Sequence, residues 1–204
     1  MASDSGAVRR PNSRGALTRE NLLAAAAEAF SQRGFHGTST RDIAVAARMS
    51  AAALYAHYAT KEEILFELSL DGHRSVHRVL LESVRPHSTA RERLLAASTA
   101  FAQWHAEFHT QARVAQYELK SLTPAHLDEV MELRRATRDL FAGLVTNGVS
   151  DGSFSVESVE QTTMILTSMG IDIARWFRPA GTLTPAEIGT FHGQIALRVV
   201  GCRR

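Results

Sequence analysis

Signals for the start of α-helices recur along this chain, and they constrain its fold more than any other feature. In each signal a serine or threonine stands three residues before a carboxylate, so that the two side chains cap the free N–H groups of the first helical turn. The pairs are Ser39–Asp42, Thr60–Glu63, Thr89–Glu92 and Thr184–Glu187. Apolar residues then return every three or four positions, and no useful stretch alternates as a strand would. The sequence therefore predicts an all-α fold of about nine helices.

The expected helices follow from these starts and from the residues that end helices. Six of them have a predicted course, which is Thr18 to Gly34, Thr60 through Val76, Thr89 towards His109, about 111–120, Thr123 to about Thr146, and about Val156 to Pro179. For the other three only the start is predicted, at Ser39, Ser50 and Thr184. Asn147-Gly148 is expected to end the seventh helix, and Asp151-Gly152 is expected to form a turn.

Two of these helices are short and are joined by only about three residues, which is the spacing of a helix-turn-helix unit. In such a unit the second helix enters the major groove of DNA. Its sequence here lies in SAAALYAHYATKEE, residues 50–63. The three alanines allow close approach to base edges, and alanine also contacts a thymine methyl group. Leu54 is expected to point inward, whereas Tyr55 and His57 offer polar hydrogens to phosphates and Lys61 adds a cation at the next helix N-terminus.

The distribution of charge agrees with an anionic partner at the N-terminal end. Residues 1–61 contain eight Lys and Arg side chains against four Asp and Glu, whereas the rest of the chain contains 15 against 17. A net charge of only +2 hides this asymmetry. Residues 1–16 contain arginines with no apolar run behind them, so we expect a flexible basic arm rather than a secretion signal. A single cysteine and the lack of a membrane-spanning apolar stretch lead us to expect a cytoplasmic protein.

Residues 19–66 resemble the N-terminal DNA-binding domain of the tetracycline-repressor (TetR) family of bacterial regulators. The shared marks are the Ala-Ala…Phe helix, Gly34, the Thr-Ser before the second helix, Ile43-Ala44, Ser50, Leu54-Tyr55, His57-Tyr58 and Lys61-Glu62. The residue pattern and the resemblance together give the expected DNA-binding residues, which are Ser39, Thr40, Arg41, Ser50, Ala51, Ala52, Ala53, Tyr55, His57 and Lys61. Ser39 is equally a helix cap. The alanines cannot form side-chain hydrogen bonds, so Arg41 is expected to read a base and DNA shape to supply the rest.

Residues 67–204 resemble the effector-binding and dimerisation region of the same family. The resemblance implies that the last two helices pair with their counterparts in a four-helix dimer interface. The run ARWFRPAGTLTPAEIG, residues 174–189, is similar to the tail of actinobacterial members that sense acyl-CoA or steroid-derived thioesters. Bulky groups on the middle helices are the candidate effector-binding residues, with ordinary core packing as the alternative. They are Trp104, Phe108, Tyr117, Met131, Phe141 and Met164.

The expected protein is a ligand-responsive transcriptional repressor with three parts, an arm over residues 1–16, a helix-turn-helix domain over 17–62 and an effector-binding and dimerisation domain over 63–204. We expect it to bind palindromic operator DNA as a homodimer and to be released by a small apolar or acyl-CoA-like effector. We expect neither a cofactor nor an enzyme, because nucleophile motifs, phosphate loops and dinucleotide fingerprints are absent.

Two alternatives stay open at this point. The first is a metal-responsive regulator, because His73/His77 and His105/His109 are each spaced so that both rings share a helix face. No thiolate or further ligand accompanies either pair, so no metal is expected. The second is a helical interaction protein that does not bind DNA.

Overall fold

The computed structural model describes the backbone of residues 13–202 and the side chains of residues 18–202. Within this range it contains nine α-helices, one short 3-10 helix and no strand, which confirms the predicted all-α fold. The elements are α1 (Ser13–Arg33), α2 (Thr40–Ala46), α3 (Ala51–Tyr55), α4 (Lys61–Val84), α5 (Ala90–Glu107), α6 (His109–Tyr117), η1 (Leu119–Ser121), α7 (Pro124–Ser150), α8 (Val159–Trp176) and α9 (Pro185–Val199).

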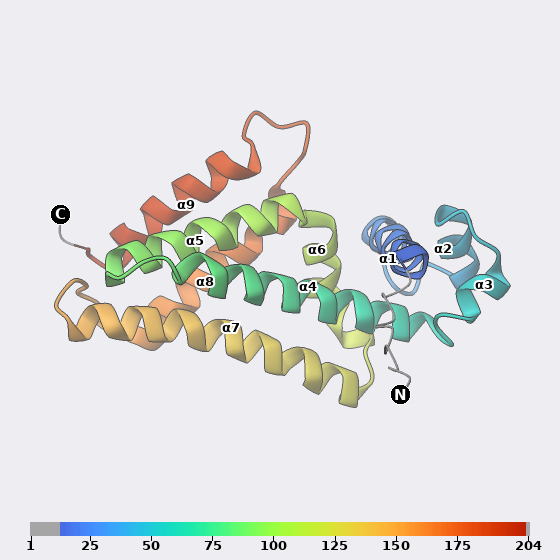
Figure 1. Ribbon diagram of the computed structural model, residues 1–204, viewed down its shortest axis with the longest axis horizontal. Helices are drawn as coiled ribbons and strands as arrows, with labels where there is room; N and C mark the ends of the chain where they lie inside the picture. Colours follow the sequence, from blue (N-terminus) through green and yellow to red (C-terminus); the bar gives the residue numbers. More distant parts are fainter. Residues whose placement is uncertain (1–12, 203–204) are drawn as a thin grey trace, which may run out of the picture.

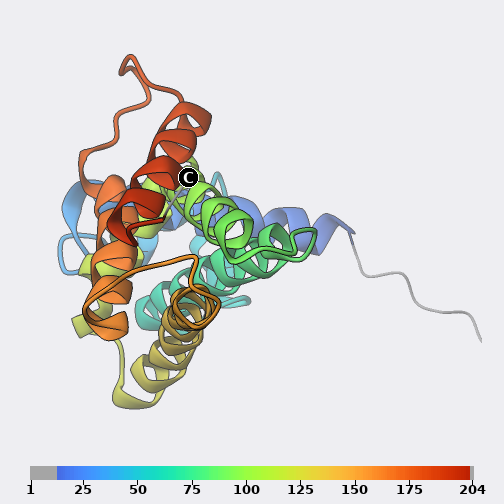
Figure 2. The same cartoon turned by 90° about the vertical axis from the view of Figure 1, so that its left-hand side faces the viewer.

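The helices form a small N-terminal unit at one end of a larger helical body (Figure 1). Helices α1, α2 and α3 make up the small unit, and α4 runs from this unit into the body. The view turned by 90° shows α7 and α9 on opposite sides of the body, where α9 packs against α5 and α7 packs against α4 and α8 (Figure 2). Helix α4 therefore links the two parts physically.

The predicted caps are present at the helix starts. Ser39, Thr89 and Thr184 each form a complete capping box. Thr60 differs, because its hydroxyl accepts the N–H of Glu63 but the Glu63 carboxylate accepts the N–H of Ala59 at 2.8 Å instead of the N–H of Thr60. Each device satisfies N–H groups that the first turn of a helix leaves without a partner.

Two helix boundaries differ from the sequence expectation. Helix α1 begins at Ser13, so residues 13–16, which were expected in the arm, are helical, and residues 1–12 lie outside the described range. Helix α7 continues past Asn147-Gly148 to Ser150. Gly148 is buried, and a Cβ atom there would lie 2.0 Å from the ring of Phe154. This glycine makes room for an aromatic ring and does not cap the helix.

The hydrophobic core of the small unit continues into the body. Leu22, Phe30, Ile43 and Leu54 of the small unit belong to one buried cluster that also includes Ile64 and Leu65 of α4, Val114 of α6 and Val130 of α7. A second cluster fills the body between α4, α5, α7, α8 and α9. Full burial of a leucine side chain contributes about 1.5–3 kcal/mol. The small unit is thus held by contacts with α4, α6 and α7 as well as by its own.

Candidate DNA interface and effector cavity

Helices α2 and α3 are held in a helix-turn-helix arrangement by the turn between them. Arg48 in this turn has a left-handed backbone, with φ of 55°, and the N–H of Met49 donates to the carbonyl of Ala44. The Ser50 hydroxyl then caps α3 by accepting the N–H of Ala53 at 3.1 Å. Leu54 is completely buried, which confirms its predicted inward position. The turn and this leucine together fix the orientation of α3.

The exposed surface of α3 is small and smooth at its start. Ala51 and Ala52 are exposed and Ala53 is half-buried, so no long side chain covers the first turn. Small side chains of this kind would allow close approach to a groove wall, and the DNA contact itself stays a prediction. Arg41 and His57 are also exposed beside it. The arrangement keeps the predicted DNA-facing residues accessible.

Thr40 and Tyr55 join α2 to α3. The Thr40 and Tyr55 hydroxyls share a hydrogen bond of 2.9 Å, and the Tyr55 side chain is about half exposed. Two of the expected DNA-binding residues therefore lie side by side. Ser39 acts as a helix cap, since its Oγ accepts the N–H of Asp42 and donates to the Asp42 carboxylate.

Lys61 begins α4, as predicted, but makes contacts that the sequence did not predict. Its Nζ donates to the carbonyls of Phe35 and Thr38, at 2.7 Å each, and stands 4.2 Å from the centre of the Phe35 ring. An ammonium has three N–H donors, so at most one remains for a phosphate. The main observed role of Lys61 is to fasten the loop before α2 to the start of α4, and its DNA contact stays a prediction.

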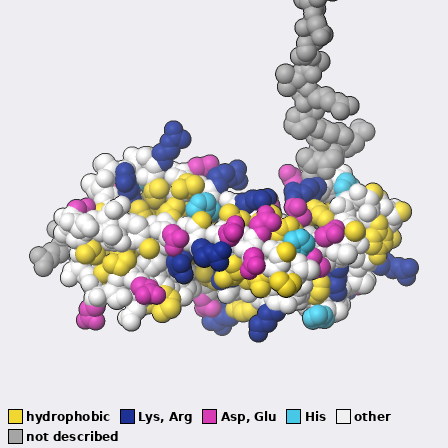
Figure 3. All heavy atoms as spheres, turned by 90° about the horizontal axis from the view of Figure 1, so that it is seen from below, with side chains coloured by type: hydrophobic (Ala, Val, Ile, Leu, Met, Phe, Trp, Pro, Cys, Tyr) yellow, Lys and Arg dark blue, Asp and Glu magenta, His cyan; other side chains and the backbone are white. Residues whose placement is uncertain are grey.

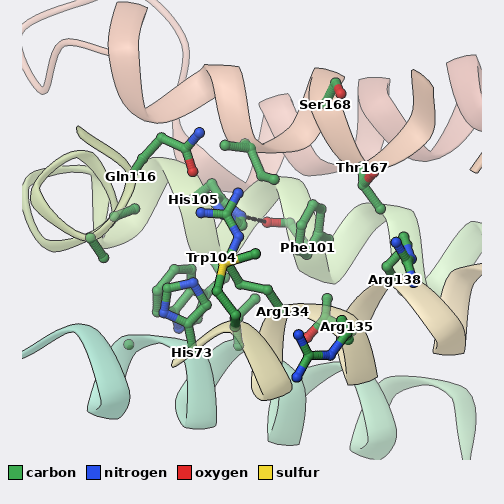
Figure 4. A pocket seen from close by; sticks show the side chains of 17 residues that line it. His73, Phe101, Trp104, His105, Gln116, Arg134, Arg135, Arg138, Thr167 and Ser168 are labelled. Atoms are coloured by element: carbon green, nitrogen blue, oxygen red, sulfur yellow. Dashed lines mark hydrogen bonds between the residues drawn. The ribbon is translucent and has the colours of Figure 1, made fainter. Parts of the chain in front are cut away.

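A cavity of about 300 Å³ lies in the body, between α4, α5, α6, α7 and α8. Its lining is apolar on Val76, Phe101, Trp104, Ala112, Ala115, Met131 and Ile171, and polar on His73, His105, Gln116, Arg134, Arg135, Thr137, Arg138, Thr167 and Ser168. Gly72 completes the wall. Figure 4 shows His73, His105 and Arg134 together at one side of the cavity, with Arg138 and Thr167 at the other. None of the lining residues is acidic.

Two of the six predicted effector-binding residues, Trp104 and Met131, line this cavity, and the other four do not. Phe141 is 1% exposed and packs edge-on against Phe101 in the core, with ring centres 5.2 Å apart. Phe108, Tyr117 and Met164 are exposed, at 42%, 55% and 60% of their surface, and do not line the cavity. Bulk and spacing identified large side chains but did not distinguish a cavity wall from a core or a surface.

The sequence reasoning missed the polar side of the cavity. The run ELRRATRDL in α7 contained a usable signal, because Arg134 and Arg138 are four residues apart and so share one helix face. His73 and His105 face the same space from α4 and α5. Burial lowers the pKa of each to about 4, and each donates its Nδ1–H to a carbonyl of its own helix, Ser69 at 2.7 Å and Phe101 at 2.8 Å. Both rings are therefore neutral at pH 7.

The two histidine pairs are engaged in contacts within the protein. His77 lies 3.3 Å from the Thr137 hydroxyl, and His109 hydrogen-bonds the Ala106 carbonyl and packs on Phe177. In the part of the chain that the structure describes, no three His, Cys, Asp or Glu side chains are arranged to hold a metal ion. Likewise, none of the helices over residues 13–202 is long and apolar enough to cross a membrane.

Helices α8 and α9 expose large apolar side chains. Met164 and Ile165 of α8 are 60% and 46% exposed, and Phe191 of α9 is 64% exposed. The face seen in Figure 3 carries basic and acidic side chains side by side, with hydrophobic side chains among them. Other large apolar side chains are exposed elsewhere, among them Val45, Leu81 and Val149. Exposed apolar groups that form one patch mark a surface that another protein covers.

A helix-turn-helix unit built onto a helical body that contains a cavity is the architecture of a DNA-binding transcriptional regulator. Comparison with known proteins agrees. Residues 22–68 match the family model for bacterial regulatory proteins of the tetR family, and residues 87–200 match that for the tetracyclin repressor-like C-terminal domain. The chain belongs to the TetR family.

Several relatives are similar over almost the whole chain. The HTH-type transcriptional repressor KstR2 of Rhodococcus jostii is 32% identical, covering 88% of this chain and 89% of its own. A tetR-family regulatory protein from Rhodococcus RHA1 has a similar structure, with a TM-score of 0.85 at 38% identity over 92% of this chain and 98% of the other. The structure of the ketosteroid transcriptional regulator KstR2 of Mycobacterium tuberculosis gives a TM-score of 0.79 at 27% identity. The match covers 96% of this chain and 97% of the other.

Proposed function

We propose that this protein is a ligand-responsive transcriptional repressor that binds palindromic operator DNA as a homodimer and releases it when an effector occupies the cavity. The observation that carries the proposal is the exposed, alanine-covered start of α3, held in place by buried Leu54 and presented at one end of the molecule. Relatives similar over most of the chain are named transcriptional repressors.

In this proposal residues 17–62 bind DNA and residues 63–204 bind the effector and the second subunit. The start of α3 enters the major groove, and Arg41 reads a base from the start of α2. Thr40, Tyr55 and His57 contact phosphates, and the hydrogen bond between Thr40 and Tyr55 orients both hydroxyls. Ser39 and Ser50 act through their caps, which set the directions of α2 and α3. Phosphate contacts position the unit, whereas base contacts select the sequence.

The homodimer forms through α8 and α9. Met164, Ile165 and Phe191 expose apolar surface that a second copy would cover, and the two-fold symmetry of such a dimer matches a palindromic operator. Ile188 and Leu197 of α9 are buried inside the subunit, so only part of the apolar surface of this helix is available for pairing.

The cavity between α4 and α8 receives the effector. Its apolar wall, formed by Phe101, Trp104 and Ile171, suits a hydrocarbon body. A similar protein is named as a ketosteroid transcriptional regulator, which agrees with an apolar effector. We therefore propose an apolar or acyl-CoA-like effector. Because α4 lines the cavity and also begins beside the helix-turn-helix unit, a change in its position on effector binding would reach α3.

Replacement of Ala52 by leucine tests the proposed groove contact. Operator sequences are first selected from random duplex DNA with the wild-type protein, and affinities are then measured by fluorescence anisotropy. Ala52→Leu should abolish specific binding, because the larger side chain prevents close approach, while circular dichroism shows an unchanged fold. The matched control is Ala125→Leu, which enlarges an exposed alanine at the start of α7. Wild-type affinity of Ala52→Leu, or failure to select any operator, would contradict the proposal.

A further inference from the structure

Arg134 is a charged group at the cavity wall with no counter-charge among the side chains of residues 18–202. Burial lowers the pKa of its guanidinium, and among residues 18–202 no side chain or carbonyl forms a hydrogen bond or ion pair with it. Other arginines at helix contacts are paired, such as Arg19 with Glu67 and Arg113 with Ser31. A charge withdrawn from water is costly unless it is paired. Arg134 thus has an unused capacity to bind an anion.

The surroundings of Arg134 cannot neutralise it. Figure 4 shows its side chain close to His73 and His105, and both rings are already committed through their Nδ1–H groups to helix carbonyls. No carboxylate lines the cavity. The neighbouring Arg138 is exposed and lies 3.3 Å from Asp139, so its charge is satisfied at the surface. Arg135 also lines the cavity but is exposed to solvent, so Arg134 is the more buried cationic group that an anion in the cavity would meet.

The apolar wall lies within the same cavity. Phe101, Trp104 and Val76 are buried side chains that line it beside the arginine. A ligand that contacts the apolar wall and also pairs with Arg134 needs an apolar body and one anionic oxygen group. A planar guanidinium binds either a carboxylate or a phosphate through paired N–H···O bonds.

We propose that the cavity binds an amphipathic anion, with a carboxylate or phosphate held by Arg134 and an apolar body against Phe101 and Trp104. This inference rests on the proposed function, because it takes the cavity to be the effector site. It adds that recognition of the effector depends on one negative charge inside the protein, and it names the residue that provides this dependence.

Three eight-carbon probes separate charge from hydrophobic contact. Binding of octanoate, octyl phosphate and 1-octanol to the full-length protein is measured by calorimetry without DNA, together with the thermal unfolding temperature. At least one anion should bind wild-type protein at least about 10-fold more tightly than octanol, because charge-assisted hydrogen bonds add to the apolar contact. The anion that binds more tightly identifies the head group as carboxylate or phosphate.

Arg134→Met is the decisive variant, and Arg91→Met is its matched control, because Arg91 is an exposed arginine of α5 that does not line the cavity. Arg134→Met should weaken anion binding about 10- to 100-fold and leave octanol binding unchanged. Because it removes an unpaired, partly buried charge, it should not lower the unfolding temperature of the free protein. Arg91→Met should retain the wild-type anion affinity.

Three results would overturn the inference: equal wild-type affinity for octanol and both anions, unchanged anion binding by Arg134→Met, or an equal loss of all three probes with a lower unfolding temperature. The last would assign Arg134 a structural role. Operator binding is measured separately. If anion binding depends on Arg134 but does not release the operator, the proposed effector response is contradicted. The anion site at Arg134 would still be supported.

Discussion

At the residue scale, the buried histidines of the cavity wall make the stability of the protein depend on pH. Burial lowers the pKa of His73 and His105 to about 4, whereas an exposed histidine has a pKa of about 6.5. Between pH 6.5 and 4 the unfolded chain therefore binds more protons than the folded chain. Stability must fall as the pH falls through this window and must be fully present above it.

Replacement of His105 by glutamine should reduce this dependence on pH. Each histidine accounts for a loss on the order of 3 kcal/mol at pH 4. Urea unfolding between pH 7 and 4.5 should show a shallower decline in the free energy of unfolding for His105→Gln than for wild type. His57→Gln, at an exposed position, is the control and should follow wild type. Parallel curves for all three proteins would show that His105 is not held neutral in the folded state.

Individual residue roles could be predicted where they depend on neighbours in sequence. Ser39 caps α2 and Leu54 is buried because both roles follow from helical spacing. Lys61 could not be placed in this way, since its partners Phe35 and Thr38 belong to a loop more than 20 residues earlier. Arg134 was missed for a related reason. Arg134 stands out because no ion-pair partner lies near it in the described structure. A sequence pattern cannot show whether such a partner is present.

At the scale of the elements, the start of α7 is attached to the start of α4. Glu62 accepts the backbone N–H of Thr123 at 2.8 Å and the Nδ1–H of His126 at 2.9 Å, and the His126 ring stacks on Phe66 with centres 3.8 Å apart. Glu62 directly follows Lys61, which holds the loop before α2. This contact connects a helix of the cavity wall to the DNA-binding unit.

Loss of this contact should loosen both helices at once. In His126→Ala, hydrogen exchange measured by mass spectrometry should accelerate in the first turns of α7 and of α4, and stability should fall by about 1–3 kcal/mol, because the Glu62 carboxylate loses its bonded partner. His87→Ala, at the junction between α4 and α5, is a control remote from this contact. Faster exchange confined to α7 would contradict a mechanical connection between the two helices.

Helix starts could be read from the sequence because caps are local, and the capping boxes at Thr89 and Thr184 lie where they were predicted. The end of α7 could not be read in the same way. Gly148 has the composition of a stop signal, but the ring of Phe154 folds back onto it and the helix continues. Contacts between elements decided this boundary.

At the scale of the whole molecule, the basic residues of the sequence and the exposed apolar groups of α8 and α9 belong to different parts of the chain. The basic N-terminal third carries the helix-turn-helix unit, and the exposed apolar groups of α8 and α9 lie in the body. The all-α fold and the division into a small and a large part were both predictable, because they follow from periodicity and from motif order. The cavity was not, because its wall combines residues from five helices.

Sedimentation of the protein on its selected operator tests most directly the central claim, that two copies read a palindrome through α3. We predict two chains on one duplex, with half-sites about one helical turn apart, roughly 34–36 Å, or somewhat more. Randomising one half-site should weaken binding strongly, because one helix-turn-helix contacts few base pairs. A single chain per duplex, with equal affinity for intact and half-randomised operators, would contradict the account.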